Sequence, residues 1–474
     1  MKQEPSSAKT SSVEKPFLSR RMSSSSLSSC SNSTATDHDA TNDDNKSFPV
    51  CADEPNLYQI PPDLPPVYQP LPTWLVASLA ASVIWSFRTF NQTTNGEWSM
   101  FVMMIALVEA VAIGVLLKSV LEEILVPPIR ISTRDLIREY VLPSKFSKFE
   151  SVKFKLPAAD RKAHKSAVLG VHYQEYHQQK QRDQPSQFQS LYVNHGFGVS
   201  SLTWVPVLPI LVERLRTQIG LGHDAVGFGF TDRASSDCLE AYTPTGSAAI
   251  GTALLQSKAP VVTNDKPVLL MGHSLGTLAT LQMALSLPLE TPKWVVLVAP
   301  AVGMRPYIGR QNHLLQWLIK GLLSGLSVVW KYALKRLVGA KNFWRLAVEV
   351  VMWADPKLVL DADVLRVQWP AIGLGWEDGL VKYALAMTTL PTTPTDQELV
   401  EQVVSLSNTV VTVVCGPHDK LVSGPFVRKF FAPHGDDIRI VEMEGLAHNP
   451  MEEDVGRFVG LLEQLWEEDK GRLI

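Results

Sequence analysis

The chain has 474 residues, of which 45% are hydrophobic and 19% are charged, and its formal net charge is −3. This length holds one large domain with appended segments or a few ordinary domains. The near-neutral charge gives no global field that would favour a nucleic-acid partner. Its 4 cysteines are too few and too scattered for a disulfide framework or a zinc site.

Residues 1–70 differ in composition from the rest of the chain. They are rich in serine up to residue 33 and rich in proline from residue 61. Few apolar side chains are present to offset the entropy lost on ordering, so we predict a disordered tail. A transit peptide would also be rich in serine, but Glu4 and Glu14 depart from its acid-poor pattern. Whether the tail is a targeting peptide stays open.

Two apolar stretches follow, at 71–87 without a charge and at 98–117 with one, Glu109. A bilayer-spanning helix needs about 20 apolar residues, with a lower limit near 17. Interfacial aromatic residues flank the stretches, namely Trp74, Trp85 and Trp98. The loop between them is short, so we predict a two-helix membrane anchor at 71–117. The alternative is a pair of buried helices in a soluble domain.

The segment 118–147 is interpreted as a linker. Basic residues lie close behind the second apolar stretch, at Lys118, Arg130, Arg134 and Arg138. An excess of such residues marks the cytosolic side of a membrane. We therefore expect a membrane-bound protein whose following domain, residues 148–474, faces the cytosolic or an equivalent side. The organelle is left open.

From residue 148 onward, strand patterns alternate with helical patterns. An antiparallel pair is expected at 151–156 and 166–176, where polar and apolar residues alternate. Buried strands are expected at 190–196, 223–229, 266–274, 293–300, 408–416 and 437–445, and helices at 208–219, 245–257, 278–287 and 454–468. This order predicts an α/β fold with a mainly parallel, eight-stranded sheet, an antiparallel edge and helices on both faces.

The interval between the strands at 293–300 and 408–416 is far longer than a crossover requires. Its pattern is mostly helical, so we predict an inserted helical cap at about 301–400. The cap holds half of the chain's 12 tryptophans, together with several lysines and arginines. Basic helices rich in tryptophan and leucine can lie at a membrane interface. An ordinary cap whose aromatic side chains pack on the core fits the pattern equally well.

In sheets of this kind, catalytic groups gather beyond the carboxyl ends of the strands. The string "GHSLG" places Ser274 after a predicted strand and before a predicted helix. This strand–turn–helix context is that of a nucleophile elbow, and Gly272 and Gly276 leave room for its tight turn. We therefore predict Ser274 as a catalytic nucleophile.

A serine hydroxyl needs a base, and the base needs an orienting carboxylate. His448 is the histidine that follows the last predicted strand, and Asp419 follows the strand at 408–416. The chain order serine, aspartate, histidine is typical of hydrolases built on such sheets. We predict these two residues as the other members of a catalytic triad. The alternatives are a surface histidine and a turn-forming aspartate.

Two backbone N–H groups are needed to stabilise a tetrahedral oxyanion. Leu275, directly after the nucleophile, supplies one, and Phe197 in the string "NHGFG" supplies the other. We expect the neighbouring residues to contact the substrate, namely His195, Gly196, Gly198 and His273. This chemistry requires no metal and no cofactor.

The strings "YVNHGFG", "AVGFGFTDR", "LLMGHSLG", "VVCGPHD" and "MEGLAHNPMEE" together resemble the α/β-hydrolase fold superfamily over about 150–474. The end of the cap is similar to the branch that includes epoxide hydrolases and carbon–carbon bond hydrolases. Epoxide hydrolases use an aspartate nucleophile, whereas the elbow of this chain carries Ser274. The resemblance implies transfer of an acyl group to water through Ser274, His448 and Asp419.

We predict a membrane-associated serine hydrolase that cleaves an ester-type bond of a lipophilic small molecule. The alternatives on the same triad are an acyltransferase, a carbon–carbon bond hydrolase and a perhydrolase. A non-catalytic membrane binding module is a further alternative. The expected partners are the substrate and the membrane, and not nucleic acid. The acyl chain, the head group and the oligomeric state are left open.

Overall fold

The computed structural model describes residues 144–157, 164–179, 185–235, 238–259, 266–304, 321, 325, 327–338, 340–390 and 394–473. The predicted tail at 1–70, the predicted membrane anchor at 71–117 and all but the end of the linker at 118–147 lie outside these residues. Among the helices within the described ranges, none combines the length and the hydropathy that a bilayer crossing requires.

The described chain forms an eight-stranded sheet in the order β1-β2-β4-β3-β5-β6-β7-β8. β2 pairs antiparallel with β1 and with β4, and the remaining pairs are parallel. The strands are β1 (Ser147–Pro157), β2 (His164–His177), β3 (Ser190–Asn194), β4 (Ile219–His223), β5 (Val268–His273), β6 (Lys293–Val298), β7 (Thr409–Cys415) and β8 (Ile438–Glu442). The predicted mainly parallel sheet with an antiparallel edge is confirmed.

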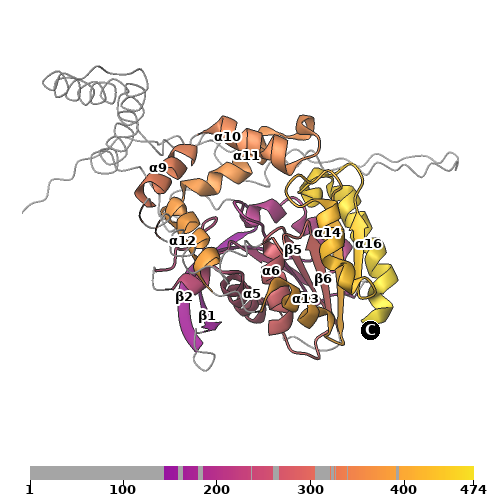
Figure 1. Ribbon diagram of the computed structural model, residues 1–474. Helices are drawn as coiled ribbons and strands as arrows, with labels where there is room; N and C mark the ends of the chain where they lie inside the picture. Colours follow the sequence, from indigo (N-terminus) through magenta and orange to yellow (C-terminus); the bar gives the residue numbers. More distant parts are fainter. Residues whose placement is uncertain are drawn as a thin grey trace, which may run out of the picture. The chain divides into compact units, whose positions relative to one another are not determined.

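The central strands are buried on both faces because helices cover the sheet from two sides (Figure 1). One face packs against α5 (Pro244–Lys258), α6 (Gly276–Ser286), α13 (Asp396–Val404) and α14 (Gly424–Phe431), and the other against α4 (Leu208–Arg214) and α16 (Val455–Asp469). Successive side chains of a strand point to opposite faces, so Leu269 and Leu270 belong to different cores. Continuous apolar runs therefore suit these strands.

The segment between β6 and β7 contributes a separate group of helices, drawn in orange along one side of the sheet in Figure 1. They are α9 (Ser327–Val338), α10 (Lys341–Leu346), the π-helix η3 (Ala347–Met352), η4 (Pro356–Leu358), α11 (Asp361–Gln368), η5 (Trp369–Ile372) and α12 (Trp376–Thr389). We call this group the cap. Its core includes Trp344, Trp353, Trp369 and Trp376. These tryptophans therefore pack inside the protein, while Trp330 is exposed.

The helix α13 begins within the expected cap boundaries of 301–400 but packs against α6 and β7. It therefore belongs to the helical layer on the sheet. The remaining described helices are short and lie in connecting segments: η1 (Ser201–Trp204), η2 (Leu239–Tyr242), η6 (Ala432–His434), α15 (Pro450–Glu453) and η7 (Lys470–Arg472).

The predicted position of one strand was wrong. The sequence predicts a strand at 223–229, but β4 ends at His223 and the chain turns away from the sheet. Gly227 and Gly229 have φ angles of 99° and 49°, which a strand does not allow. The preceding residues form the strand, where Gly220 and Gly222 leave room for the side chains of Leu208, Val212 and Val193. The expected helix at 208–219 correspondingly ends at Arg214.

The turn after β4 is held by a buried carboxylate, that of Asp224. It accepts hydrogen bonds from His172 Nδ1 at 2.8 Å and from the N–H groups of Ser201 and Phe230, both at 2.7 Å. Nε2 of His172 lies 2.9 Å from the Ser147 hydroxyl. Burial by itself would raise the pKa of Asp224, but the His172 imidazole and the donors outweigh it and hold this pKa well below its ordinary value.

Replacing Asp224 by alanine should destabilise the fold by about 3–5 kcal/mol, because it leaves His172 and two backbone donors without their buried acceptor. Because the pKa of Asp224 is lower in the folded protein than in the unfolded chain, its ionised carboxylate stabilises the fold at pH values above the ordinary pKa of aspartate. That stabilisation is lost as the pH falls through the lowered pKa. Urea unfolding at neutral pH measures the change, with Asp436→Ala on the surface as the control. A difference from the control below about 0.5 kcal/mol would contradict this role.

Candidate active site

Ser274 lies in a turn between β5 and α6, at the carboxyl end of the parallel strands. Its φ angle is 52°, in the left-handed region that residues other than glycine rarely adopt. The turn is held on both sides, since Ser274 N–H donates to the Val298 carbonyl at 2.9 Å and the Ser274 carbonyl accepts from Ala301 N–H at 3.2 Å. The strained backbone is therefore fixed by the neighbouring strand β6 and the residues after it.

Three glycines around Ser274 leave space that a side chain would fill. A Cβ atom at Gly272 would lie 2.8 Å from the Gly276 carbonyl oxygen, and one at Gly276 would lie 2.7 Å from the Asn194 carbonyl oxygen. A Cβ atom at Gly196 would lie 2.9 Å from Ser274 Cβ. The elbow thus packs directly against the loop that follows β3, which contains the "NHGFG" string.

His448 and Asp419 meet at the same edge of the sheet. His448 Nδ1 donates to Asp419 Oδ2 at 2.7 Å, and both side chains are buried. The other carboxylate oxygen of Asp419 accepts from the N–H groups of Leu421 and Val422 at 2.7 and 2.8 Å. Because Nδ1 carries the donated proton, Nε2 is the atom of His448 that can accept one.

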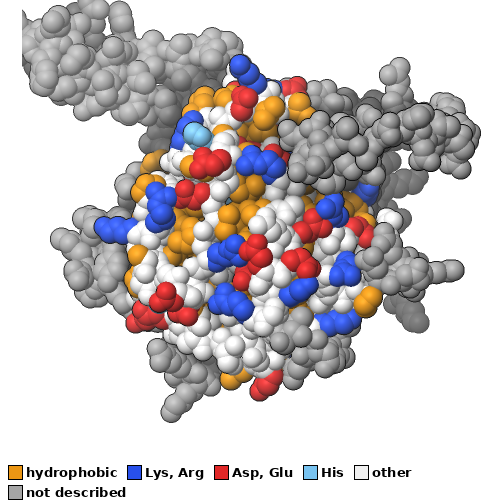
Figure 2. Space-filling view, turned by 90° about the vertical axis from the view of Figure 1, so that its right-hand side faces the viewer, with side chains coloured by type: hydrophobic (Ala, Val, Ile, Leu, Met, Phe, Trp, Pro, Cys, Tyr) orange, Lys and Arg blue, Asp and Glu red, His pale blue; other side chains and the backbone are white. Residues whose placement is uncertain are grey.

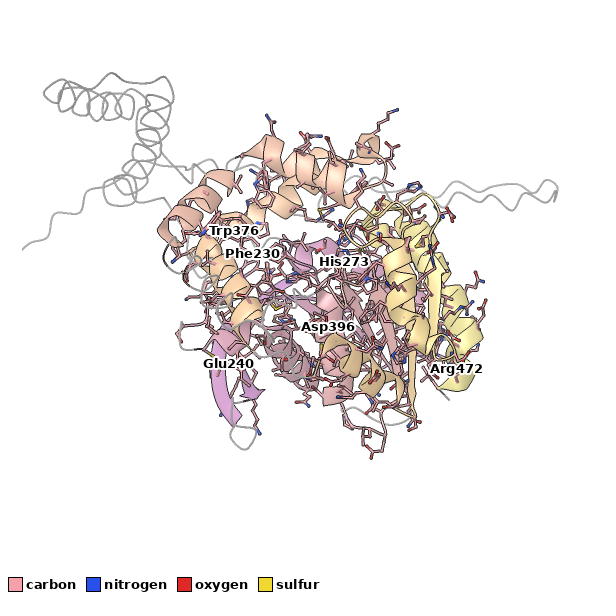
Figure 3. All side chains as sticks on the ribbon, in the orientation of Figure 1. Phe230, Glu240, His273, Trp376, Asp396 and Arg472 are labelled. Atoms are coloured by element: carbon pink, nitrogen blue, oxygen red, sulfur yellow. The ribbon has the colours of Figure 1, made fainter. Side chains whose placement is uncertain are left out.

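The structure also brings His448 to the elbow. His273, which precedes Ser274, donates from Nε2 to the His448 carbonyl at 2.9 Å, and the two imidazole rings lie 4.8 Å apart between their centroids. Figure 3 shows His273 at the centre of the protein, between the sheet and the cap. Within the described residues the Ser274 hydroxyl makes no hydrogen bond to another side chain. Such bonds are often formed only in complexes with substrate.

The two expected oxyanion donors lie beside the elbow. In the part of the chain that the structure describes, neither Phe197 N–H nor Leu275 N–H donates to another group. Leu275 is the residue that precedes α6, where helices leave backbone N–H groups unpaired. Both groups therefore remain available to a bound oxygen.

His195 and His273, which the sequence predicts as substrate contacts, support the backbone of this site. His195 Nδ1 donates to the Gly196 carbonyl at 2.7 Å, and Nε2 accepts from Ala225 N–H at 2.9 Å. Burial lowers the pKa of His195 and holds that of His273 well below its ordinary value, so both imidazoles are neutral at physiological pH. Gly198 has a φ angle of 76° in the same loop. Contact of these residues with substrate stays a prediction.

A small pocket of about 30 Å³ adjoins the expected oxyanion donors. Its walls are mostly apolar and include Phe197, Leu275, Val226, Phe228, Ala279 and, from the cap helix α12, Tyr383. Ser247 adds a hydroxyl that lies 3.2 Å from His223 Nε2. This volume holds about two water molecules, so a larger substrate group requires the exposed Phe197 side chain or the cap to move.

Sequence reasoning missed the cap residues that reach the site, Tyr383 and Met352. It also missed Glu453, whose carboxylate binds the loop that carries His448. Glu453 lies in the string "HNPMEE". The hydrophobic periodicity that predicts the cap helices carries no information about their hydrogen bonds to distant loops, so the sequence did not single it out. The described residues contain no cluster of three or more histidine, cysteine, aspartate or glutamate side chains arranged to hold a metal ion.

Comparisons with known proteins give a family match for the chain. The model of the alpha/beta hydrolase family matches residues 191–461, more than half of the chain. No curated protein sequence matches the chain.

Three solved structures illustrate the likeness in fold. An esterase from Thermogutta terrifontis is 13% identical with a TM-score of 0.44, and the match covers 67% of this chain and 98% of that one. An epoxide hydrolase from Acinetobacter nosocomialis is 14% identical with a TM-score of 0.47, over 70% and 94%. A bromoperoxidase from Bacillus anthracis is 15% identical with a TM-score of 0.44, over 68% and 100%.

Replacing Gly276 by alanine should destabilise the fold by about 1–3 kcal/mol, because the added methyl group meets backbone oxygens that cannot rotate away. Thermal unfolding measures the loss. The control is Gly460→Ala in α16, where nothing lies within 4 Å of the added atom. In a helix interior that substitution should stabilise by about 0.5–1 kcal/mol. Equal effects at both positions would show that the elbow is not tightly packed.

Proposed function

The chain belongs to the alpha/beta hydrolase family, and we propose that its hydrolase activity is that of a membrane-associated serine hydrolase acting on an ester-type bond of a lipophilic substrate. The observation that carries the proposal is the buried hydrogen bond from His448 to Asp419, which leaves Nε2 of His448 without a hydrogen bond among the described residues. His273, next to the strained Ser274, binds the His448 carbonyl and so holds this histidine beside the elbow. A nucleophile, a base and an orienting carboxylate thereby come from the carboxyl ends of β5, β8 and β7 of one sheet.

The proposed reaction begins when His448 Nε2 takes the proton of the Ser274 hydroxyl. The serine oxygen forms a bond to the carbonyl carbon, and the carbonyl electron pair moves onto its oxygen. The N–H groups of Phe197 and Leu275 stabilise this oxyanion. Asp419 holds the imidazole in the required tautomer and stabilises the imidazolium.

The oxyanion then collapses, the carbon–oxygen bond to the alcohol breaks, and His448 gives the leaving alcohol its proton. A water molecule attacks the acyl-enzyme in the second half of the reaction. His448 takes a proton from this water and returns it to Ser274 as the acid is released. The base is thus restored in each cycle, and the balance needs only ester and water.

Support for a lipophilic substrate and a membrane surface comes from the outer side of the cap. Large apolar side chains there are between 42% and 65% exposed: Phe343, Leu346, Val350, Leu358 and Leu360. We call these residues the apolar patch. Figure 2 shows apolar side chains gathered at the upper end of the face drawn, with lysine or arginine side chains beside them. Exposed apolar clusters of this kind are typical of protein or membrane contact sites.

A fluorophosphonate probe should label the wild type and fail to label Ser274→Ala, because the probe traps an activated serine. Hydrolysis of a short dissolved ester should fall by at least about a thousandfold in Ser274→Ala. Ser286→Ala, at the end of α6, is the matched control and should retain both. A folded wild-type protein that is neither labelled nor active would refute the proposal. Product analysis in ¹⁸O water should place the label in the released acid. An acyl product that is formed with another acceptor and carries no label would identify an acyltransferase.

Leu346→Asp combined with Leu360→Asp should reduce turnover of an ester embedded in lipid vesicles by about tenfold or more. Each leucine that becomes buried in the lipid contributes roughly 1.5–3 kcal/mol to binding of the vesicle. Turnover of a short dissolved ester should stay unchanged. Leu289→Asp, at a 64% exposed leucine outside the cap, serves as the control. Equal turnover of the vesicle substrate by the double variant and the control would exclude the patch as a lipid contact.

A further inference from the structure

The five-residue cap segment 350–354 contacts both loops that carry the proposed His448 and Asp419. The Met352 carbonyl accepts from the N–H groups of His448 at 3.1 Å and of Asn449 at 3.2 Å. The Val350 carbonyl accepts from Lys420 Nζ at 2.8 Å. Met352 is the last residue of the π-helix η3, and carbonyls at a helix end lack partners within the helix. The cap therefore presents unpaired acceptors where the two loops present donors.

Glu453 connects the same two elements through its side chain. One carboxylate oxygen accepts from Ala354 N–H in the cap at 2.7 Å, and the other accepts from Ala447 N–H at 2.9 Å. Ala447 is the residue that directly precedes His448. Hydrogen bonds to an ionised acceptor are roughly twice as strong as neutral ones. A single side chain thus joins the cap to the residue before His448.

A second connection lies on the neighbouring residue of α15. Glu452 Oε1 is 3.1 Å from the Arg366 guanidinium of the cap helix α11, and Glu452 Oε2 accepts from the Asn449 side chain at 2.8 Å. Arg366 and Glu452 are buried. Residues 448–453 are therefore bound to the cap through the backbone of His448 and Asn449 and through the side chains of Glu452 and Glu453.

We propose that Glu453 is a positioning residue for His448. Its carboxylate binds the N–H groups of Ala354 in the cap and of Ala447 beside His448, and it thereby fixes the position of His448 relative to the cap. The inference rests on the proposed serine hydrolase function and deepens it. Movement of the cap, one of the two ways in which the small pocket admits a larger substrate group, is then transmitted to the backbone of His448. A displacement of about 1 Å at a catalytic group can cost a hundredfold in rate. The cap consequently acts on the reaction rate and not only on entry of the substrate.

Glu453→Gln tests the proposal, since the amide has one accepting oxygen and turns a donor toward the other N–H group. The kcat for a short dissolved ester should fall between about tenfold and a hundredfold, with KM within about twofold of the wild-type value. The low-field proton resonance of the hydrogen bond between His448 and Asp419 should shift or broaden. Glu444→Gln, an exposed residue just before the same loop, is the matched control and should change neither.

Ala354→Pro removes the cap-side donor and leaves Glu453 in place. Trp353 has φ and ψ angles of −113° and 148°, which the residue before a proline readily adopts, so this variant is expected to fold. It should lower kcat, as Glu453→Gln does.

Wild-type labelling by the fluorophosphonate probe is measured first, and its absence would refute the proposed function separately. With labelling present, a folded variant at either position with wild-type kcat, or with only a raised KM, would overturn the positioning role.

Discussion

The arrangement of the site depends on one strained residue, Ser274, whose backbone is left-handed between a parallel strand and a helix. The conformation is tolerated because strand β6 and Ala301 hold the turn by hydrogen bonds on both sides. It also requires that Gly196, Gly272 and Gly276 carry no side chain. The loop after β3 can then lie against the elbow, so Phe197 and Leu275 line the same pocket.

Two buried aspartates accept hydrogen bonds from the same kinds of donor but differ in the surroundings of their histidine partners. Asp224 and Asp419 each accept from two backbone N–H groups and from Nδ1 of a histidine. His172, the partner of Asp224, has its second nitrogen bound to the Ser147 hydroxyl. His448, the partner of Asp419, keeps Nε2 unbound among the described residues. The environment of that second nitrogen distinguishes a pair that stabilises the fold from a pair suited to proton transfer.

The cap is part of the site as well as its cover. Tyr383 lines the pocket beside Phe197 and Leu275. The Met352 carbonyl binds the N–H groups of His448 and Asn449 directly, and Ala354 binds the histidine loop through Glu453. Its tryptophans pack inward and stabilise this group of helices, while leucines of the apolar patch face outward. The same insertion therefore combines a rigid inner face with an apolar outer face.

The sequence by itself determined the fold class, because buried parallel strands need continuous apolar runs and the helices between them need amphipathic ones. It also indicated Ser274, Asp419 and His448, since strand ends are recognisable and the glycines around the elbow are required by sterics. It failed at β4, where glycines in a left-handed conformation looked like part of an apolar strand. Only the tertiary structure decided that Nε2 of His172 binds the Ser147 hydroxyl while Nε2 of His448 stays unbound among the described residues. It alone also decided that Glu453 joins the cap to the histidine loop. The contact between Ala354 and Glu453 links residues 99 positions apart, and such hydrogen bonds leave no periodic pattern in the chain.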